Sequence, residues 1–365
     1  MQRRTFLQTG LGTALAAPLI AAMQQDQLDA AAEVLAKAVA EGQLHAATLY
    51  VRQGKSVFAK AFGASKSPDD IFLLASISKP MSATALMTLY DQGKLRLTDT
   101  VTQFIPEFTG AERDKITVRQ LLTHVSGLPD QLPENQSLRK RHAPLSEFVA
   151  GAIRTPLLFD PGSQYRYSSM GILLASEIAH RISGMAFTEF IDKALFQPLG
   201  MGRSALGLGR LKLEETIRCQ VDNAAQESGA GDPSAETWDW NSPYWRNFGA
   251  PWGGAHASAP DVARFFAEFL HPSGKAIKPE TARLMLRNHN PEGIRPRGFG
   301  FSIGARAGSP GCSENTFGHS GATGTLAWAD PATDAICVVL TTLPGRAANP
   351  HPRQLASDHV AKATH

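Results

Sequence analysis

The sequence contains two serine–lysine pairs with Ser-x-x-Lys spacing, Ser76 with Lys79 and Ser137 with Lys140. Residues three positions apart lie on one face of a helix, so in each pair the lysine can contact its serine. A desolvated lysine can act as the base that turns a serine hydroxyl into a nucleophile, which is the chemistry of covalent acyl transfer. About one such pair is expected by chance in a chain of this composition, so the surrounding sequence has to discriminate between them.

The surroundings of the two pairs differ. Ser76 follows the apolar run 71–75 and opens a strong helical pattern, and Pro80 is tolerated only in the first turn of that helix. Ser76 is therefore predicted at a helix N-terminus, where backbone N–H groups and the helix dipole favour a developing oxyanion. The alternative for Ser76 is a plain helix N-cap. Ser137 lies in the polar, basic stretch 133–142, which we interpret as a solvated surface segment.

Two further segments carry groups suited to the same chemistry. Tyr167 and Ser169 lie at a turn that leads into the amphipathic pattern 168–184, and a tyrosine there can place its phenol near a site. Taken alone, Tyr167 would more often be a packed core residue. Residues 319–321 lead into a predicted strand, and Gly321 would let a substrate approach the strand edge and bind its free N–H groups.

The elements that position these residues are extended at the two ends of the chain and helical in the middle. Strands are predicted over a hairpin at 46–63 that turns at Gly54, over 298–305, and over a hairpin at 325–343 that turns at 330–334. Helices are predicted over 26–41 (with Asp26 as N-cap), 80–93, 117–124, 145–154, 168–184, 187–195, 260–271, 279–288 and 353–363. Strands from both ends must share one sheet, which predicts an α+β fold with a large helical insertion. Residues 23–75 and 290–365 would form the α/β domain, and 76–289 the mainly helical domain.

In chain order, Ser76-x-x-Lys79, Tyr167-x-Ser169 and His319-Ser320-Gly321 resemble the three motifs of the serine β-lactamase/penicillin-binding superfamily. The resemblance is greatest to the branch of class C β-lactamases, related carboxylesterases and D-alanyl-D-alanine carboxypeptidases. The segments that also resemble that branch are 121–130, 161–184, 190–201, 253–265 and 318–324. The resemblance therefore spans nearly the whole chain after residue 22. It implies a β-lactamase/transpeptidase-like fold, an antiparallel sheet flanked by helices, with the site between the sheet and the helical insertion.

The resemblance also implies a role for each motif residue. Ser76 would be the acylated nucleophile, Lys79 would orient and deprotonate it, and Tyr167 would pass the proton to the leaving group. The N–H groups of Ser76 and Ala322 would form the oxyanion hole. The residues expected to contact the substrate are Ser169, His319, Ser320 and Gly321. No metal ion or organic cofactor is implied, and the partner would be a small ester, amide or peptide.

The sequence departs from class C β-lactamases in two of these motifs. Ser169 stands where those enzymes have asparagine, and a serine hydroxyl is shorter and offers fewer donors than an amide. His319 and Ser320 stand for lysine and threonine, and a histidine with an ordinary pKa of about 6.5 is mostly neutral at pH 7. The lost charge favours less anionic esters or amides, so an esterase-like or D-Ala-peptidase-like serine hydrolase is predicted. The alternative functions are a β-lactamase and a non-catalytic sensor or binding protein. A separate hypothesis is that His319 is protonated and works as a cation in place of the lysine.

Composition and the N-terminus set the cellular context. The 365 residues include 36 Lys+Arg, 33 Asp+Glu and 43% hydrophobic residues, which excludes a disordered chain. So balanced a charge gives little reason to bind nucleic acid. Residues 1–22 combine Arg3 and Arg4 with a short apolar run, which predicts a twin-arginine signal and a periplasmic or secreted protein. No later run of 18 apolar residues occurs, so stable membrane insertion is not expected.

Two features stay open at this level. The segment 238–252 holds four of the five tryptophans, and apolar aromatic segments often line small-molecule sites. We expect it to form a wall of the acyl pocket, with a packed flap over the helical domain as the alternative. The three cysteines, Cys219, Cys312 and Cys337, are interpreted as buried small side chains, although one disulfide of unknown pairing is possible in an oxidising compartment.

Overall fold

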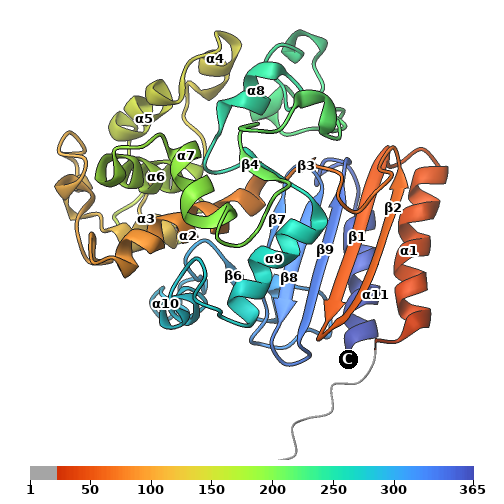
Figure 1. Ribbon diagram of the computed structural model, residues 1–365. Coiled ribbons are helices and arrows are strands. Elements are labelled where there is room, and N and C mark those ends of the chain that lie inside the picture. Colours follow the sequence, from red (N-terminus) through yellow and green to blue (C-terminus); the bar gives the residue numbers. More distant parts are fainter. Residues whose placement is uncertain (1–22) are drawn as a thin grey trace, which may run out of the picture.

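The computed structural model describes residues 23–365, and the predicted export signal at 1–22 lies outside the described residues. A six-stranded antiparallel sheet has the order β2-β1-β9-β8-β7-β6 (Figure 1). Its strands are β1 (Ala46–Gln53), β2 (Ser56–Gly63), β6 (Ser302–Ile303), β7 (Phe317–Gly321), β8 (Thr325–Asp330) and β9 (Ala335–Thr341). Because β1 pairs with β9, the two ends of the chain share one sheet, as predicted.

Helices cover both faces of this sheet. In Figure 1, α9 (Ala259–Leu270) lies in front of the strands, whereas α11 (Pro352–Thr364) lies behind them and packs against α1 (Gln25–Ala40). Alternate residues of β9 therefore join two different cores. Ile336, Val338 and Leu340 belong to the core that includes α9, and Ala335, Cys337 and Val339 to the core that includes α1 and α11. Burial on both faces explains why β9 is a continuous apolar run.

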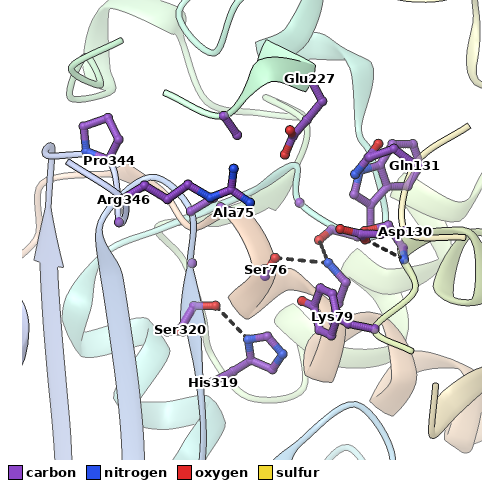
Figure 2. Close-up of a pocket in the computed structure, with 18 of the residues that line it drawn as sticks. Ala75, Ser76, Lys79, Asp130, Gln131, Glu227, His319, Ser320, Pro344 and Arg346 are labelled. Carbon is purple, nitrogen blue, oxygen red and sulfur yellow. Dashed lines mark hydrogen bonds between the residues drawn. The ribbon is translucent and has the colours of Figure 1, made fainter. Parts of the chain in front are cut away.

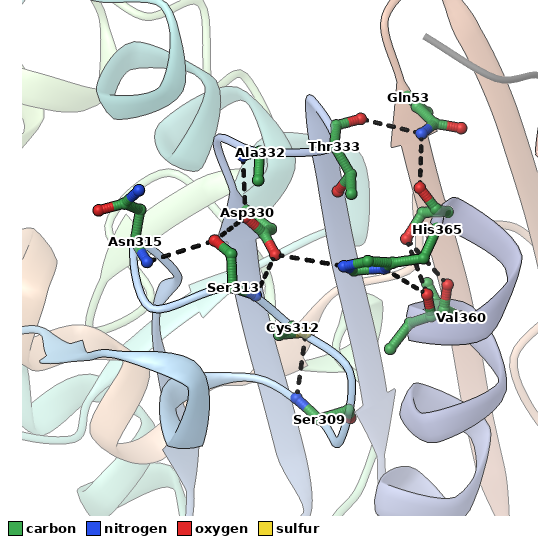
Figure 3. Close-up of polar contacts among 12 residues, drawn as sticks. Gln53, Ser309, Cys312, Ser313, Asn315, Asp330, Ala332, Thr333, Val360 and His365 are labelled. Atoms are coloured by element: carbon green, nitrogen blue, oxygen red, sulfur yellow. Dashed lines mark hydrogen bonds and ion pairs between the residues drawn. The ribbon is translucent and has the colours of Figure 1, made fainter.

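Side-chain amide and carboxylate groups tie one end of the sheet together (Figure 3). Gln53 Nε2, at the end of β1, donates to the carbonyl oxygens of Thr333 and Thr364, each at 2.9 Å. Asp330, at the end of β8, accepts from the N–H of Ser313 at 2.7 Å and from its hydroxyl at 2.5 Å. These contacts join the β8–β9 turn to β1 and to the end of α11.

The second part of the molecule is mainly helical. Its helices are α2 (Ser78–Asp91), α3 (Val118–Leu122), α4 (Asn135–Lys140), α5 (Leu145–Arg154), α6 (Ser169–Ser183), α7 (Phe187–Ile191), α8 (Pro243–Phe248) and α10 (Pro279–Met285). A small sheet of β3 (Phe72–Leu73), β5 (Ala255–Ala257) and β4 (Ser204–Leu206) lies beside them in the order β3-β5-β4. Every residue of α2 from Ser78 to Leu89 is buried, so this helix is enclosed on all sides.

The structure differs from the sequence-based expectation at several elements. The predicted strand 298–305 is reduced to β6, because Gly300 and Gly304 have φ values of +78° and +88°, outside the extended region. Asp26 is not the N-cap of α1; Gln24 holds that position, and Asp26 lies in the first helical turn. Within the range 76–289, α9 packs on the large sheet rather than on the helical part. The short helices α4 and α8 were not expected, since six residues show little periodicity.

The three cysteines are free and buried, in agreement with their interpretation as small core side chains. Burial raises the pKa of the Cys312 thiol to about 11. Among the helices of residues 23–365, none has both the length and the apolar character needed to span a membrane.

Candidate active site

Ser76 lies in a short 3₁₀ turn, Ala75–Ile77, that leads directly into α2. Lys79 Nζ donates to Ser76 Oγ at 3.1 Å and to the carbonyl oxygen of Trp252 at 2.9 Å (Figure 2). The N-cap position of α2 belongs to Ile77, and no side chain caps the helix, so the interpretation of Ser76 as a plain N-cap is wrong. The hydroxyl of Ser76 is held by a lysine instead of by the helix.

The backbone before Ser76 is held in an unusual conformation. Ala75 has a φ of +48°, which side chains other than glycine rarely adopt. Two threonine hydroxyls anchor the residues before it, since Thr323 Oγ1 donates to the Leu73 carbonyl and Thr325 Oγ1 to the Leu74 carbonyl, both at 2.8 Å. The turn that carries Ser76 is thereby fastened to the β7–β8 connection.

Two backbone N–H groups are available for an oxyanion. Within residues 23–365, the amides of Ser76 and Ala322 donate no hydrogen bond to any other group. Gly321, directly before Ala322, packs so closely against the Ser76 turn that an added Cβ would lie 2.2 Å from the Leu74 carbonyl oxygen. The absence of a side chain at Gly321 therefore lets the two N–H groups come together, which supports the oxyanion-hole interpretation.

The edge of β7 is open where a substrate would lie. Strand β6 pairs with β7 only at Phe317 and Gly318, so residues 319–321 have no partner strand on that side. This edge faces a cavity of about 450 Å³, within the usual size of small-molecule sites. All eight residues predicted for the site line this cavity: Ser76, Lys79, Ser169, Tyr167, His319, Ser320, Gly321 and Ala322. The structure brings them together, and their individual catalytic roles stay predictions.

Tyr167 packs against Lys79 and a buried histidine. Lys79 Nζ lies 4.7 Å from the centroid of the Tyr167 ring, and the ring of His124 is also 4.7 Å away, centroid to centroid. His124 Nδ1 accepts from the Ser168 N–H at 3.2 Å, and burial, together with the charge of Arg297, holds the pKa of His124 well below its ordinary value. A neutral His124 thus fixes the turn that presents Tyr167.

Ser169 is bound to an acid that the sequence interpretation did not single out. Asp130 Oδ1 accepts from the Ser169 hydroxyl at 2.5 Å and from its N–H at 3.0 Å. The hydroxyl proton of Ser169 is therefore already committed, and this residue offers a substrate only its oxygen lone pairs. Asp130 itself lines the cavity, as does Gln131 beside it.

His319 is neutral, and the positive charge beside the open edge of β7 comes from Arg297. His319 Nδ1 donates to the Ser320 carbonyl at 2.8 Å, so Nε2 is an acceptor, and it faces Arg297 Nη2 at 2.8 Å. Burial and then the charge of Arg297 hold the pKa of His319 well below its ordinary value. The hypothesis that His319 works as a cation is therefore wrong.

Arg297 was missed by the sequence interpretation. Arg297 is 2% exposed, its Cζ lies 5.8 Å from the centroid of the Tyr167 ring, and its Nη1 donates to Ser302 Oγ at 2.6 Å. A buried arginine leaves no local sequence signal, because arginine is ordinarily a surface residue. Its presence corrects the inference that the lysine-to-histidine change removes the positive charge from the site.

The tryptophan-rich segment reaches this cavity, and so does one residue between the second serine and lysine. Trp240, Trp245 and Trp252 line it, which supports the pocket-wall hypothesis. The pair at 137–140 lies on α4, where Ser137 is exposed but Arg139 is only 1% exposed and lines the cavity. The interpretation of this stretch as a solvated surface segment is thus wrong for Arg139.

The location of the charge leads to a testable prediction. In Arg297→Gln, we expect kcat/KM for substrates with a carboxylate in the leaving group to fall about ten- to hundredfold, since hydrogen bonds to charged groups contribute about 1.5–3 kcal/mol. Because the pKa of His319 is held well below its ordinary value, the unmodified protein should show no His319 ionisation in a kcat/KM profile between about pH 6 and 8. A titration midpoint of kcat/KM in that pH interval that disappears in His319→Gln would contradict the assignment of His319 as neutral.

Within residues 23–365, no three His, Cys, Asp or Glu side chains gather in a way that could hold a metal ion. The fold and the site together define a class of protein: a β-lactamase/transpeptidase-like fold that presents a helix-borne serine–lysine pair beside an open strand edge. The chain belongs to the Beta-lactamase family, whose family model matches residues 31–361.

One of the similar curated proteins is an esterase. Esterase EstB of Burkholderia gladioli is 31% identical over 182 residues, which are 46% of this chain and 46% of the esterase. In such matches the chain spans less than half the length of the curated relative.

Two solved structures share the fold along most of both chains. The structure of EstCE1, a hydrolase with promiscuous acyltransferase activity, has a TM-score of 0.76 at 21% identity and covers 92% of this chain and 99% of its own. The D-amino acid amidase of Ochrobactrum anthropi SV3 has a TM-score of 0.75 at 22% identity and covers 93% and 99%.

Proposed function

We propose that this protein is a serine hydrolase that forms an acyl-enzyme on Ser76 with a small ester or amide. The observation that carries the proposal is the 3.1 Å contact of Lys79 Nζ with Ser76 Oγ, in a cavity where the N–H groups of Ser76 and Ala322 are unpaired. A base, a nucleophile and an oxyanion site are the three parts that acyl transfer requires. The similarity to an esterase and the shared fold with a D-amino acid amidase support it.

The geometry suggests a sequence of steps. For this step Lys79 is the neutral amine, and the 3.1 Å contact is used with Ser76 Oγ as the donor. Ser76 Oγ bonds to the substrate carbonyl carbon while its proton passes to the lone pair of Lys79 Nζ, and the carbonyl oxygen takes the negative charge between the two N–H groups. The bond to the leaving alcohol or amine then breaks, and that group takes up a proton through Tyr167, which Lys79 replenishes. Water next attacks the ester on Ser76, which releases the acid and restores the serine hydroxyl.

The leaving-group side of the cavity favours a substrate class that the sequence alone had disfavoured. Arg297 lies beside His319 and Tyr167, so a carboxylate on the leaving group would meet a buried guanidinium. Peptides that end in D-alanine carry such a carboxylate, as do β-lactams. The proposed substrates therefore include D-Ala peptides as well as simple esters.

The proposed function includes an exported location, periplasmic or secreted. It is supported by Arg3 and Arg4 before a short apolar run. Changing both arginines to lysine should retain the protein in the cytoplasm, as cell fractionation would show. Unchanged export would contradict the twin-arginine assignment.

The deciding experiment is an activity panel on the purified mature protein. It contains short p-nitrophenyl esters, a chromogenic cephalosporin and peptides that end in D-Ala-D-Ala. We expect a burst of leaving group followed by slower turnover, and a mass adduct on Ser76 after treatment with an activated phosphonate. Turnover of the cephalosporin above all other substrates would favour a β-lactamase. Saturable binding without turnover of any compound would favour a non-catalytic binding protein.

A further inference from the structure

A second buried arginine lines the cavity, and two of its guanidinium nitrogens lack a hydrogen-bond partner among residues 23–365. Arg139 on α4 is 1% exposed and lines the cavity that holds Ser76. Its Nε and Nη1 atoms are buried without a partner among residues 23–365. The guanidinium stacks on the face of the Trp245 ring, with Arg139 Cζ 3.8 Å from the ring centroid.

A buried guanidinium destabilises the folded protein unless an acceptor binds its N–H groups. Burial of a charged donor without a hydrogen bond destabilises the folded protein, and stacking on a tryptophan offsets only part of that cost. Burial lowers the pKa of Arg139 to about 10, so the side chain is still positively charged at neutral pH. The donors of Arg139 therefore remain available to an acceptor that enters the cavity.

The protein's own acids leave these donors free. Glu227 also lines the cavity and is the acid whose charge acts on Arg139, yet the two form no ion pair within 4.0 Å. Glu227 lies in the 3₁₀ turn Gln226–Ser228, which contacts α4, and its side chain is half-buried. Glu227 can lower the local potential, but it does not satisfy the buried N–H groups of Arg139.

A chain of contacts places Arg139 relative to the reacting atoms. Lys79 Nζ donates to the Trp252 carbonyl at 2.9 Å, the Trp252 and Trp245 ring centroids are 6.4 Å apart, and Trp245 stacks on Arg139. A separate chain of contacts runs from Lys79 to the Tyr167 ring and from that ring to Arg297. In the view of Figure 2, Glu227 and His319 lie on opposite sides of Ser76. The turn of Glu227 contacts α4, which carries Arg139, whereas the His319 ring lies 6.0 Å from the Tyr167 ring. With Tyr167 serving the leaving group, as in the proposed function, Arg139 is assigned to the acyl side.

We propose that Arg139 anchors an anionic group at the far end of the substrate's acyl portion. The preferred substrates would then be monoesters or monoamides of dicarboxylic acids. One carbonyl bonds to Ser76, Trp245 and Trp252 cover the methylene groups, and the free carboxylate accepts hydrogen bonds from Arg139. This inference rests on the proposed function and adds the class of acyl group to it.

The test compares charged and neutral acyl groups of equal length. The monoethyl esters of succinic, glutaric and adipic acid are each assayed by acid release against the ethyl ester of the corresponding linear monocarboxylic acid. We expect one monoester of the series to exceed its neutral counterpart in kcat/KM. In Arg139→Met, kcat/KM for that monoester should fall about ten- to hundredfold, as expected for the loss of a charge-assisted hydrogen bond. For the neutral ester, kcat/KM should fall less than about threefold.

Controls separate an anchor from a structural role. Equal losses of the charged and the neutral ester in Arg139→Met would show that Arg139 only supports the tryptophan wall. If that variant fails to fold, Arg139→Lys replaces it, and a loss confined to the charged ester is again the expected result. The midpoint of thermal unfolding is measured for Glu227→Gln and Arg139→Met. Equal decreases in the two variants would identify Glu227 as the charge partner of Arg139 and overturn the proposal.

Failure of the proposed function would be visible separately. If neither these esters nor any compound of the activity panel is hydrolysed, the hydrolase proposal fails, and calorimetric binding of free adipate still tests the anchor. Binding to the unmodified protein that is lost in Arg139→Met supports the anchor. Hydrolysis of neutral esters with no preference for any monoester, and no adipate binding, would keep the hydrolase and reject the anchor.

Discussion

Replacing Ser76 with alanine is expected to lower kcat for every ester and amide about 10⁴-fold or more, because among residues 23–365 no other hydroxyl is hydrogen-bonded to Lys79. The alanine variant should keep its fold, since the Ser76 hydroxyl caps no helix and its loss leaves α2 intact. The measurement is kcat for the best ester of the panel, together with the midpoint of thermal unfolding.

Ser137→Ala is the matched control for Ser76→Ala. It changes the serine of the other Ser-x-x-Lys pair, whose exposed hydroxyl donates only to the Glu134 carbonyl at 2.8 Å. We expect its activity to stay within about twofold of the unmodified protein, as for an ordinary surface substitution. Retained turnover in Ser76→Ala, or a phosphonate adduct that maps to another residue, would contradict the proposed mechanism.

The second large effect is expected for Gly321→Ala. An added Cβ would lie 2.2 Å from the Leu74 carbonyl oxygen and 2.2 Å from Thr325 Oγ1, so strand β7 or the Ser76 turn must shift. Either movement separates the N–H groups of Ser76 and Ala322, and the loss of one oxyanion donor costs about 10²–10³ in kcat. We expect kcat to fall by that factor, with a much smaller change in KM for a neutral ester.

Gly202→Ala controls for the general effect of adding a methyl group, since a Cβ at Gly202 would meet nothing within 4 Å. Its kcat should equal that of the unmodified protein. Thermal unfolding of both variants shows whether the site or the whole fold is affected. A Gly321→Ala variant with normal kcat would show that Ala322 N–H does not bind the oxyanion.

Much of the fold could be predicted because its signals are local. Period-two alternation and a glycine turn mark the β1–β2 hairpin, and Pro80 marks the start of the helix that follows Ser76. Elements with few residues, or with mixed sequence signals, were harder to predict. The backbone at Gly300 and Gly304 shortens a predicted strand, and the packing of α9 on the sheet depends on residues far from it in sequence.

The sequence by itself identified the groups that we propose to react. The spacing of Ser76 and Lys79 is a property of one helical turn, and Tyr167 and residues 319–321 were recognisable from motif order. The tertiary structure decided the charges around those groups. Arg297 faces Nε2 of His319 and makes it an acceptor, and Arg139 places a buried guanidinium in the same cavity, with Nε and Nη1 unpartnered among residues 23–365. Burial of an arginine depends on long-range packing, which no local pattern encodes, so only the folded chain shows where these charges lie.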